Sequence, residues 1–280
     1  LDFYDEHYSA NKMRLVVLGK EPLDTLQNWV MNKFSNISNK NIPSTEIEQS
    51  FFDLDALPAQ LNVKTVMDKR SLTIAFPIPS ASPYKDSQPI SYIANLIGHE
   101  GKGSLLSKLK SMDLVDGLSA GSEFDTQKHA IFMINMSLTQ KGLNNYKLVL
   151  NIVFDYLALF KHKGIQKLYS HEQSKLLSIA FKYQEKSEPI HYTSSLAMAL
   201  QESTPEEVLV EDYELTNFNP ALYLAFIEKL TPSNMLIALS AQNLDTEKET
   251  LWYQAPYMSN KLDAELVRDL KQTENYNDLH

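Results

Sequence analysis

Cysteine is absent from the 280 residues. Its absence excludes disulfide bonds and any zinc or iron–sulfur site that depends on thiolate ligands. Long apolar runs are also missing, because no stretch reaches the roughly 18 residues that a membrane-spanning helix needs. We therefore expect no membrane partner. The compartment stays open, since a periplasmic protein can also do without cysteine.

Positive charge is in short supply. Lysine and arginine number 26 against 35 aspartates and glutamates, which gives a net charge of -9 and a pI of about 5.3. A nucleic-acid partner is disfavoured, because neutralising phosphates requires clustered basic residues. The 43% hydrophobic content is typical of a globular protein, and the length suffices for one large domain or two modest ones.

The zinc motif of the common metallopeptidases is missing as well. The sequence contains no His-x-x-Glu-His. Residues 96–110 read LIGHEGKGSLLSKLK, but their glycines and lysine are out of register for a phosphate-binding loop. The position four after His99 is Gly103, which cannot ligate a metal. The other histidines form no ligand pair at helical spacing, so we expect no catalytic residue, metal site or cofactor in this chain.

Strand-like and helical patterns follow one another along the chain. The β-branched run RLVVLG at 14–19 predicts a buried strand, and a helix is expected at 22–34. The polar stretch 35–50 predicts a linker and a domain boundary. Further strands are expected at 61–66, 70–79, 117–124, 130–139 and 234–241. Further helices are expected within 81–98 and at 140–164, 166–186, 192–202, 205–217 and 220–230, and the tail predicts a loop and a short helix.

Two of these strands carry more specific expectations. Pro79, with Pro77, predicts that the strand at 70–79 lies at an edge of the sheet or ends there. In the strand at 130–139 one face is wholly apolar, whereas the opposite face becomes polar at Asn135 and Ser137. This pattern is typical of a sheet covered by helices on one side. The order of elements predicts an α+β fold, a mostly antiparallel sheet with helices packed on one face.

Four stretches carry a family resemblance. They are FYDEHYSANKMRLVVLGKEPLDTL at 3–26, LIGHEGKGSLLSKLKSMDLVDGLSAG at 96–121, SLTQKGLNNYKLVLNIVFDYLALFKHKGI at 137–165 and YQAPYMSNKLDAE at 253–265. Together they resemble the M16 family of zinc metallopeptidases, the pitrilysin and insulin-degrading-enzyme group. The likeness runs from Tyr8 to about Gln272 with consistent spacing, which makes the set specific although each piece alone is weak.

The resemblance implies a fragment of a larger zinc metalloendopeptidase that degrades peptides. Members of the family have related α+β domains in two bowl-shaped halves, which enclose a chamber, and the first domain carries the zinc motif. Residues 1–44 then correspond to the C-terminal part of that first domain, without its zinc motif. Residues 45–280 correspond to the second, non-catalytic domain. We expect zinc in the parent enzyme and no hydrolysis by this chain alone.

The resemblance also implies a substrate-binding segment, or exosite, that anchors a peptide by backbone pairing. Ala120 and Ser122 replace the Gly and Gln of the insulin-degrading-enzyme branch, which puts the geometry of the anchor in question. A turn between two helices that binds nothing is the structural alternative for the glycine cluster. Carried over by position, the exosite residues are Gly98, His99, Glu100, Gly101, Leu118, Ser119, Ala120, Gly121 and Ser122.

The implied partners are peptide substrates and the remaining M16 domains of the same parent chain. Apolar surface left bare by a missing first domain also allows a homodimer of the fragment. The tail WYQAPY is nearer to bacterial pitrilysin, which implies a periplasmic location. A different class stays open, namely an inactive M16-like scaffold or assembly subunit of the processing-peptidase or core-protein type. The first residue is Leu1 rather than Met, so we expect a piece of a longer protein.

Overall fold

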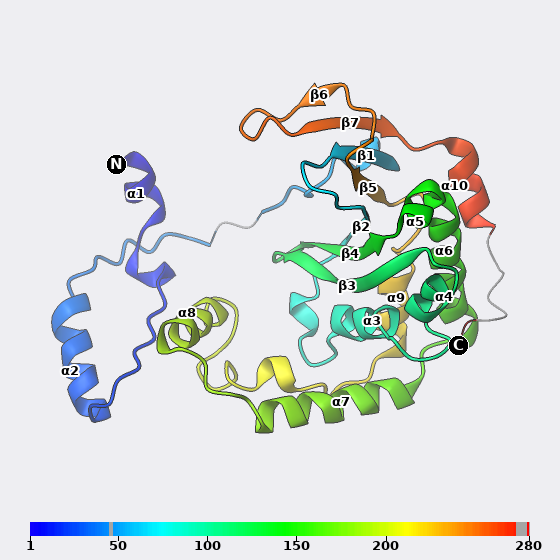
Figure 1. Cartoon of the computed structure of the whole chain (residues 1–280). Helices are drawn as coiled ribbons and strands as arrows, with labels where there is room; N and C mark the ends of the chain where they lie inside the picture. Colours follow the sequence, from blue (N-terminus) through cyan, green and yellow to red (C-terminus); the bar gives the residue numbers. More distant parts are fainter. Residues whose placement is uncertain (45–46, 273–278, 280) are drawn as a thin grey trace. The chain divides into compact units, whose positions relative to one another are not determined.

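The computed structural model describes residues 1–44, 47–272 and 279. The described chain divides into two compact units (Figure 1). Unit 1 comprises Leu1–Glu46 and Glu172–Thr216, and unit 2 comprises Ile47–His171 and Asn217–His280.

Unit 2 is built on a seven-stranded sheet with the strand order β3-β4-β2-β5-β1-β7-β6. Strands β1 and β5 are parallel, and the other neighbouring pairs of described strands are antiparallel. This confirms the predicted mostly antiparallel sheet. The strands are β1 (Ala59–Lys64), β2 (Ser71–Pro79), β3 (Val115–Asp125), β4 (His129–Leu138), β5 (Leu236–Ala241), β6 (Lys248–Glu249) and β7 (Pro256–Lys261).

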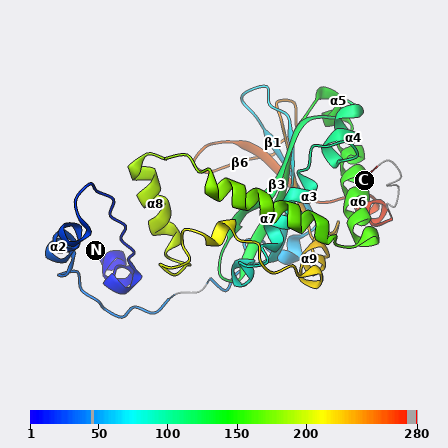
Figure 2. The same ribbon diagram turned by 90° about the horizontal axis from the view of Figure 1, so that it is seen from below.

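Helices cover one side of this sheet (Figure 2). Leu72, Ile74 and Phe76 alternate along β2 with no exposed surface, and they share a single core with apolar residues of the helices. The predicted α+β architecture is therefore confirmed. The helices of unit 2 are α3 (Pro89–Ile97), α4 (Leu105–Ser111), α5 (Gln140–Asn144), α6 (Tyr146–Lys163), α9 (Pro220–Ile227) and α10 (Ala264–Lys271), and α7 (Lys167–Lys182) begins there and continues into unit 1.

The prolines of β2 end the strand rather than mark a sheet edge. β2 lies between β4 and β5 and ends at Pro79. Its pairing with β5 stops at Ala75, whereas its pairing with β4 continues to Pro79. Pro77 therefore lies where β2 has only one neighbouring strand, and its missing N–H costs the sheet little.

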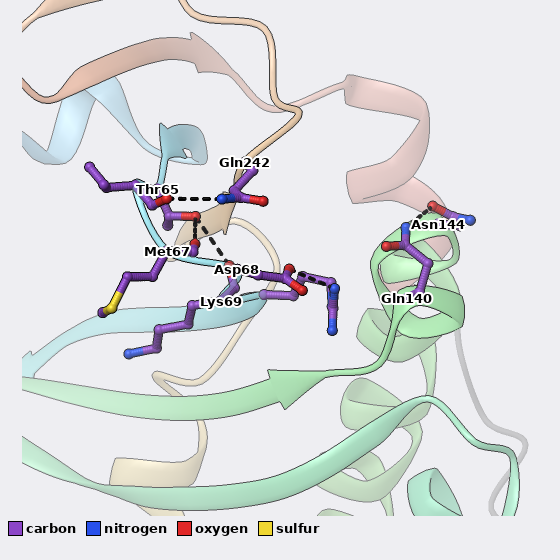
Figure 3. A network of polar contacts seen from close by, with 9 residues as sticks. Thr65, Met67, Asp68, Lys69, Gln140, Asn144 and Gln242 are labelled. Carbon is purple, nitrogen blue, oxygen red and sulfur yellow. Dashed lines mark hydrogen bonds and ion pairs between the residues drawn. The ribbon is translucent and has the colours of Figure 1, made fainter.

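The polar turn between β1 and β2 is held by side chains (Figure 3). Thr65 Oγ1 donates hydrogen bonds to the carbonyl oxygens of Met67 at 2.8 Å and Lys69 at 3.3 Å. Gln242, which follows β5, donates from Nε2 to the carbonyl oxygen of Val66 at 2.9 Å. These bonds satisfy backbone groups that leave the sheet at this end.

Unit 1 consists of helices and extended segments. Its two chain segments are joined where Arg14 Nε donates to the carbonyl oxygen of Leu200 at 2.9 Å. Phe181 and Tyr213 also pack together, with ring centroids 5.5 Å apart. Its helices are α1 (Asp2–His7), α2 (Leu23–Phe34) and α8 (Pro189–Ala199), and short 3₁₀ turns occur at Ala10–Lys12 and Glu211–Tyr213.

The predicted strand at 14–19 is wrong. These residues belong to no strand among the described residues, and Leu15, Val17 and Leu18 are exposed. A β-branched run has a propensity for strand, but it becomes one only when a neighbouring strand supplies hydrogen bonds and a face to bury.

Three further expectations are corrected. The helix predicted at 205–217 is only the 3₁₀ turn at Glu211–Tyr213. The helix predicted at 140–164 is interrupted at Asn145, whose ψ of 32° is not helical, and it forms α5, which Thr139 caps, and α6, which Gly164 follows. The tail contains β7, which was predicted as loop. Its sequence lacks an apolar alternation, and it is a strand because β1 pairs with it.

Candidate functional site

The stretch LIGHEGKGSLLSKLK forms the end of α3, a turn and most of α4. Gly98 ends α3, where its N–H donates to the carbonyl oxygen of Ala94 at 2.8 Å. Ser104 begins α4, where its Oγ accepts from the N–H of Ser107 at 3.1 Å. Both are ordinary helix-terminal contacts, so the local sequence itself dictates this helix–turn–helix connection.

Two positions in this turn favour glycine over any larger residue. Nδ1 of His99 accepts a hydrogen bond from the backbone N–H of Gly101 at 3.1 Å. A Cβ atom at Gly101 would lie 2.4 Å from Cε1 of that ring. Gly103 adopts a φ of 85°, in the left-handed region that favours glycine. The imidazole of His99 therefore folds back over its own turn.

Among the residues that the structure describes, His99 and Glu100 belong to no group of acidic and histidine side chains that could hold a metal. The residues His99 and Glu100 are both exposed. Nδ1 of His99 already accepts the N–H of Gly101, so this ring nitrogen is engaged within its own turn. The surface around Glu100 is open, so its carboxylate is available to a cationic group from solvent.

Leu118–Ser122 lies on β3, the strand at one end of the sheet. It pairs with β4 on one side, from Leu118 opposite Met136 to Ser122 opposite Phe132. No described strand occupies its other side. Half of its backbone N–H and C=O groups therefore point away from the sheet, an arrangement to which an extended peptide can add as a further strand.

The side chains of this segment divide between two faces. Leu118 and Ala120 are partly buried against the core, so they point to the helix-covered face. Ser119 is exposed, and a Cβ atom added at Gly121 would meet nothing within 4 Å. The opposite face of β3 is thus formed by small residues, which allow another backbone to come within strand spacing.

The two predicted parts of the site belong to neighbouring elements. Helix α3 and strand β3 pack against one another, so the helix that ends at Gly98 lies beside the strand that carries Leu118–Ser122. Their common features are an open turn and an open strand edge.

The far end of β3 has a feature that sequence reasoning missed. The rings of Phe51 and Phe124 pack at a centroid distance of 5.8 Å, and both side chains are exposed. Nearby, Ser80 Oγ donates to Asp125 Oδ1 at 2.6 Å, and burial raises the pKa of the Asp125 carboxyl. No local pattern marks Phe51, because its contact with β3 is made only in the tertiary fold.

The described residues do not fit a zinc ion. Among residues 1–44, 47–272 and 279, no group of three or more His, Asp or Glu side chains is placed to hold a metal. Two of the histidines make contacts of another kind. His129 Nε2 lies 2.9 Å from the carbonyl oxygen of Glu48, and His99 faces Gly101. Within the same described residues no helix is long and apolar enough to cross a bilayer.

Residues 1–175 match the family described as "Peptidase M16 inactive domain". The chain belongs to the M16 peptidase family. Residues 181–280 match a second M16 description, "Middle or third domain of peptidase M16". The family resemblance of the sequence is therefore confirmed.

Known M16 proteins align with almost the whole chain. It is 34% identical over 270 residues to the insulin-degrading enzyme of Homo sapiens, covering 96% of the chain and 26% of that protein. It is 33% identical over 284 residues to a "Putative zinc protease mug138" of Schizosaccharomyces pombe, covering 100% and 29%. The crystal structure of pitrilysin superposes with a TM-score of 0.94 at 26% identity, covering 100% and 30%. The chain thus spans less than a third of the length of these relatives.

Proposed function

We propose that this chain is a non-catalytic, substrate-binding and chamber-forming part of a pitrilysin-like zinc metalloendopeptidase. Its M16 relatives include a protein named as an insulin-degrading enzyme and another named as a putative zinc protease. In the proposed parent, zinc and the hydrolytic step belong to a domain outside these 280 residues. This chain would contribute a surface that binds the peptide substrate and part of the wall of the chamber.

The free edge of β3 is the observation that carries this proposal. An extended peptide pairing with Ser119–Ser122 would form backbone hydrogen bonds whatever its sequence, which suits an enzyme that degrades varied peptides. The open face at Gly121 leaves space for the added strand. The exposed carboxylate of Glu100 would attract the terminal ammonium of such a peptide.

Replacing Gly121 with valine in the full-length parent tests the anchor. We expect a higher KM for peptide cleavage with little change in kcat, because the branched side chain obstructs strand addition away from the scissile bond. Gly117→Val is the matched control, since its Cβ also faces open space on β3 but outside Leu118–Ser122. Equal kinetics for wild type and Gly121→Val on several peptides would exclude the anchor.

The second candidate is an inactive M16 scaffold or assembly subunit. It is favoured by the description "Peptidase M16 inactive domain" for residues 1–175. The two candidates differ in the parent reading frame upstream of Leu1. An intact His-x-x-Glu-His with a further downstream glutamate supports the protease, and a degenerate motif supports the scaffold.

The remaining features of the parent belong to the same proposal. Residues 1–44 would form the C-terminal part of the first domain, and residues 45–280 would form the second domain. The partners would be peptides and the other M16 domains of the parent, and a homodimer of the isolated chain would form through the apolar surface of segment 14–19. The periplasmic location rests on the pitrilysin-like tail, and an export signal at the start of the parent frame would test it.

A further inference from the structure

The hairpin of β6 and β7 presents three consecutive apolar side chains to solvent. Leu251 is 83% exposed, Trp252 86% and Tyr253 91%. Large apolar residues scattered singly over a surface are normal, but three in sequence at the tip of one hairpin are not. The role proposed above for β3 leaves this tip without a function.

Hydrogen bonds hold this tip in a defined conformation. The N–H of Thr250 donates to the carbonyl oxygen of Ala255 at 3.1 Å, and the N–H of Ala255 donates back to Oγ1 of Thr250 at 3.0 Å. Gln254 adopts a φ of 49° and donates its N–H to the carbonyl oxygen of Thr250 at 3.0 Å. A loop closed in this way holds its side chains out at low entropic cost, as pre-organised binding elements do.

The chemistry of the tip fits a protein pocket better than a lipid surface. Trp and Tyr are the residue types most enriched at the energetic centres of protein interfaces. A membrane-binding loop would be expected to carry a surplus of basic residues toward anionic lipid. Here residues 245–261 expose Asp245, Glu247 and Glu249 against Lys248 and Lys261, so basic residues are not in surplus.

The small area of the tip indicates that its binding partner belongs to the same polypeptide. Two aromatic side chains bury about 300–500 Å². Even with Leu251 the tip stays below the roughly 800 Å² per partner that a stable association of separate proteins needs. A second copy or an independent protein would therefore bind weakly. A covalently linked domain needs far less surface, because its effective concentration is high.

We propose that Leu251–Tyr253 is an anchor that inserts into an apolar pocket on another domain of the parent polypeptide. This inference rests on the proposed function only in assigning further M16 domains to the parent. The chain spans 26% of the insulin-degrading enzyme of Homo sapiens and 30% of pitrilysin, so related proteins have ample chain to form such a pocket.

The environment of Trp252 tests the anchor directly. The 280 residues contain two tryptophans, Trp29 and Trp252. Both this chain and the full-length parent are labelled with 5-fluorotryptophan, and the Trp252 resonance is assigned by its loss in Trp252→Phe. In the isolated chain it should shift when H₂O is replaced by D₂O, as an exposed indole does. In the full-length parent that shift should disappear.

Three results would overturn the anchor. One is a full solvent shift of Trp252 in the parent. The second is protection of Trp252 in the isolated chain as its concentration rises, which would identify a second copy as the occupant. The third is protection by phosphatidylcholine vesicles, which would identify a membrane. Each is independent of peptide cleavage, so failure of the proposed protease function is recognised separately.

A variant pair provides a second measurement. Trp252→Ser combined with Tyr253→Ser should leave the urea midpoint of the isolated chain unchanged, because both side chains are exposed there. The same pair should lower the urea midpoint of the full-length parent. Trp252→Phe combined with Tyr253→Phe keeps two apolar rings and should restore it. Equal midpoints for the serine pair and wild type in the parent would contradict the anchor.

Discussion

His99 lies folded back over Gly101, with its Nδ1 3.1 Å from the backbone nitrogen of that glycine. The ring can make this hydrogen bond only because residue 101 has no Cβ, since a side chain at Gly101 would occupy the space of the ring. The pair explains why the turn between α3 and α4 contains a histidine and glycines without invoking a metal. It also provides a sharp test of the turn.

Gly101→Ala should weaken this turn. The added methyl group displaces the ring of His99 and breaks its hydrogen bond, which should lower the free energy of unfolding by about 1 kcal/mol. Urea denaturation measures the change. Gly121→Ala is the matched control and should be neutral or slightly stabilising, because its Cβ faces open space. Equal effects of the two variants would contradict the proposed contact.

Gly142→Ala should be far more damaging. A Cβ atom at Gly142 would lie 1.8 Å from the carbonyl oxygen of Leu114, which also accepts the N–H of Thr139 at 3.1 Å. Backbone must move to relieve this overlap, so we expect a loss of about 3 kcal/mol in the free energy of unfolding. Gly117→Ala, whose Cβ meets nothing within 4 Å, serves as the control in the same urea experiment.

Alkaline pH should destabilise unit 2 through two buried phenols. Burial is the main cause that raises the pKa of Tyr92 and of Tyr156 to about 12. Unfolded tyrosine ionises near pH 10. Since the pKa is raised in the folded state, this contribution to stability is complete below about pH 10 and is lost as pH rises through 12. The loss should be on the order of 2 kcal/mol for each group.

Urea unfolding between pH 8 and pH 11 measures this dependence. Tyr156→Phe removes one of the two groups, together with the hydrogen bond from its hydroxyl to the carbonyl oxygen of Leu96. The variant should be less stable at pH 8 and should lose less stability toward pH 11 than wild type. An equally steep loss in the variant would show that Tyr156 does not contribute.

Zinc titration tests the interpretation of the histidines. The described histidines are not grouped into a ligand set, so calorimetry of the isolated chain should show no stoichiometric binding. The full-length parent, if it is a protease, should bind zinc and lose peptide cleavage when a chelator removes it. Tight stoichiometric binding by the 280 residues alone would refute this interpretation.

Local patterns predicted much of the candidate site. Register and ligand spacing around His99 excluded a phosphate loop and a metal pair. The small residues of Ser119–Ser122 were recognisable as strand. By contrast, nothing local indicates that β3 lies at the end of the sheet or that Phe51 packs on Phe124, because both depend on contacts between distant segments.

The sequence by itself determined the α+β class, the apolar face of β4 and the absence of a His-x-x-Glu-His zinc motif, because each depends on residue type and short-range period. Only the tertiary structure decided which strand-like segments become strands. Residues 14–19 have the stronger β pattern yet stay unpaired, whereas Pro256–Lys261 has the weaker one and pairs with β1. Strand formation requires a partner, and the partner is chosen by long-range packing that no local pattern records.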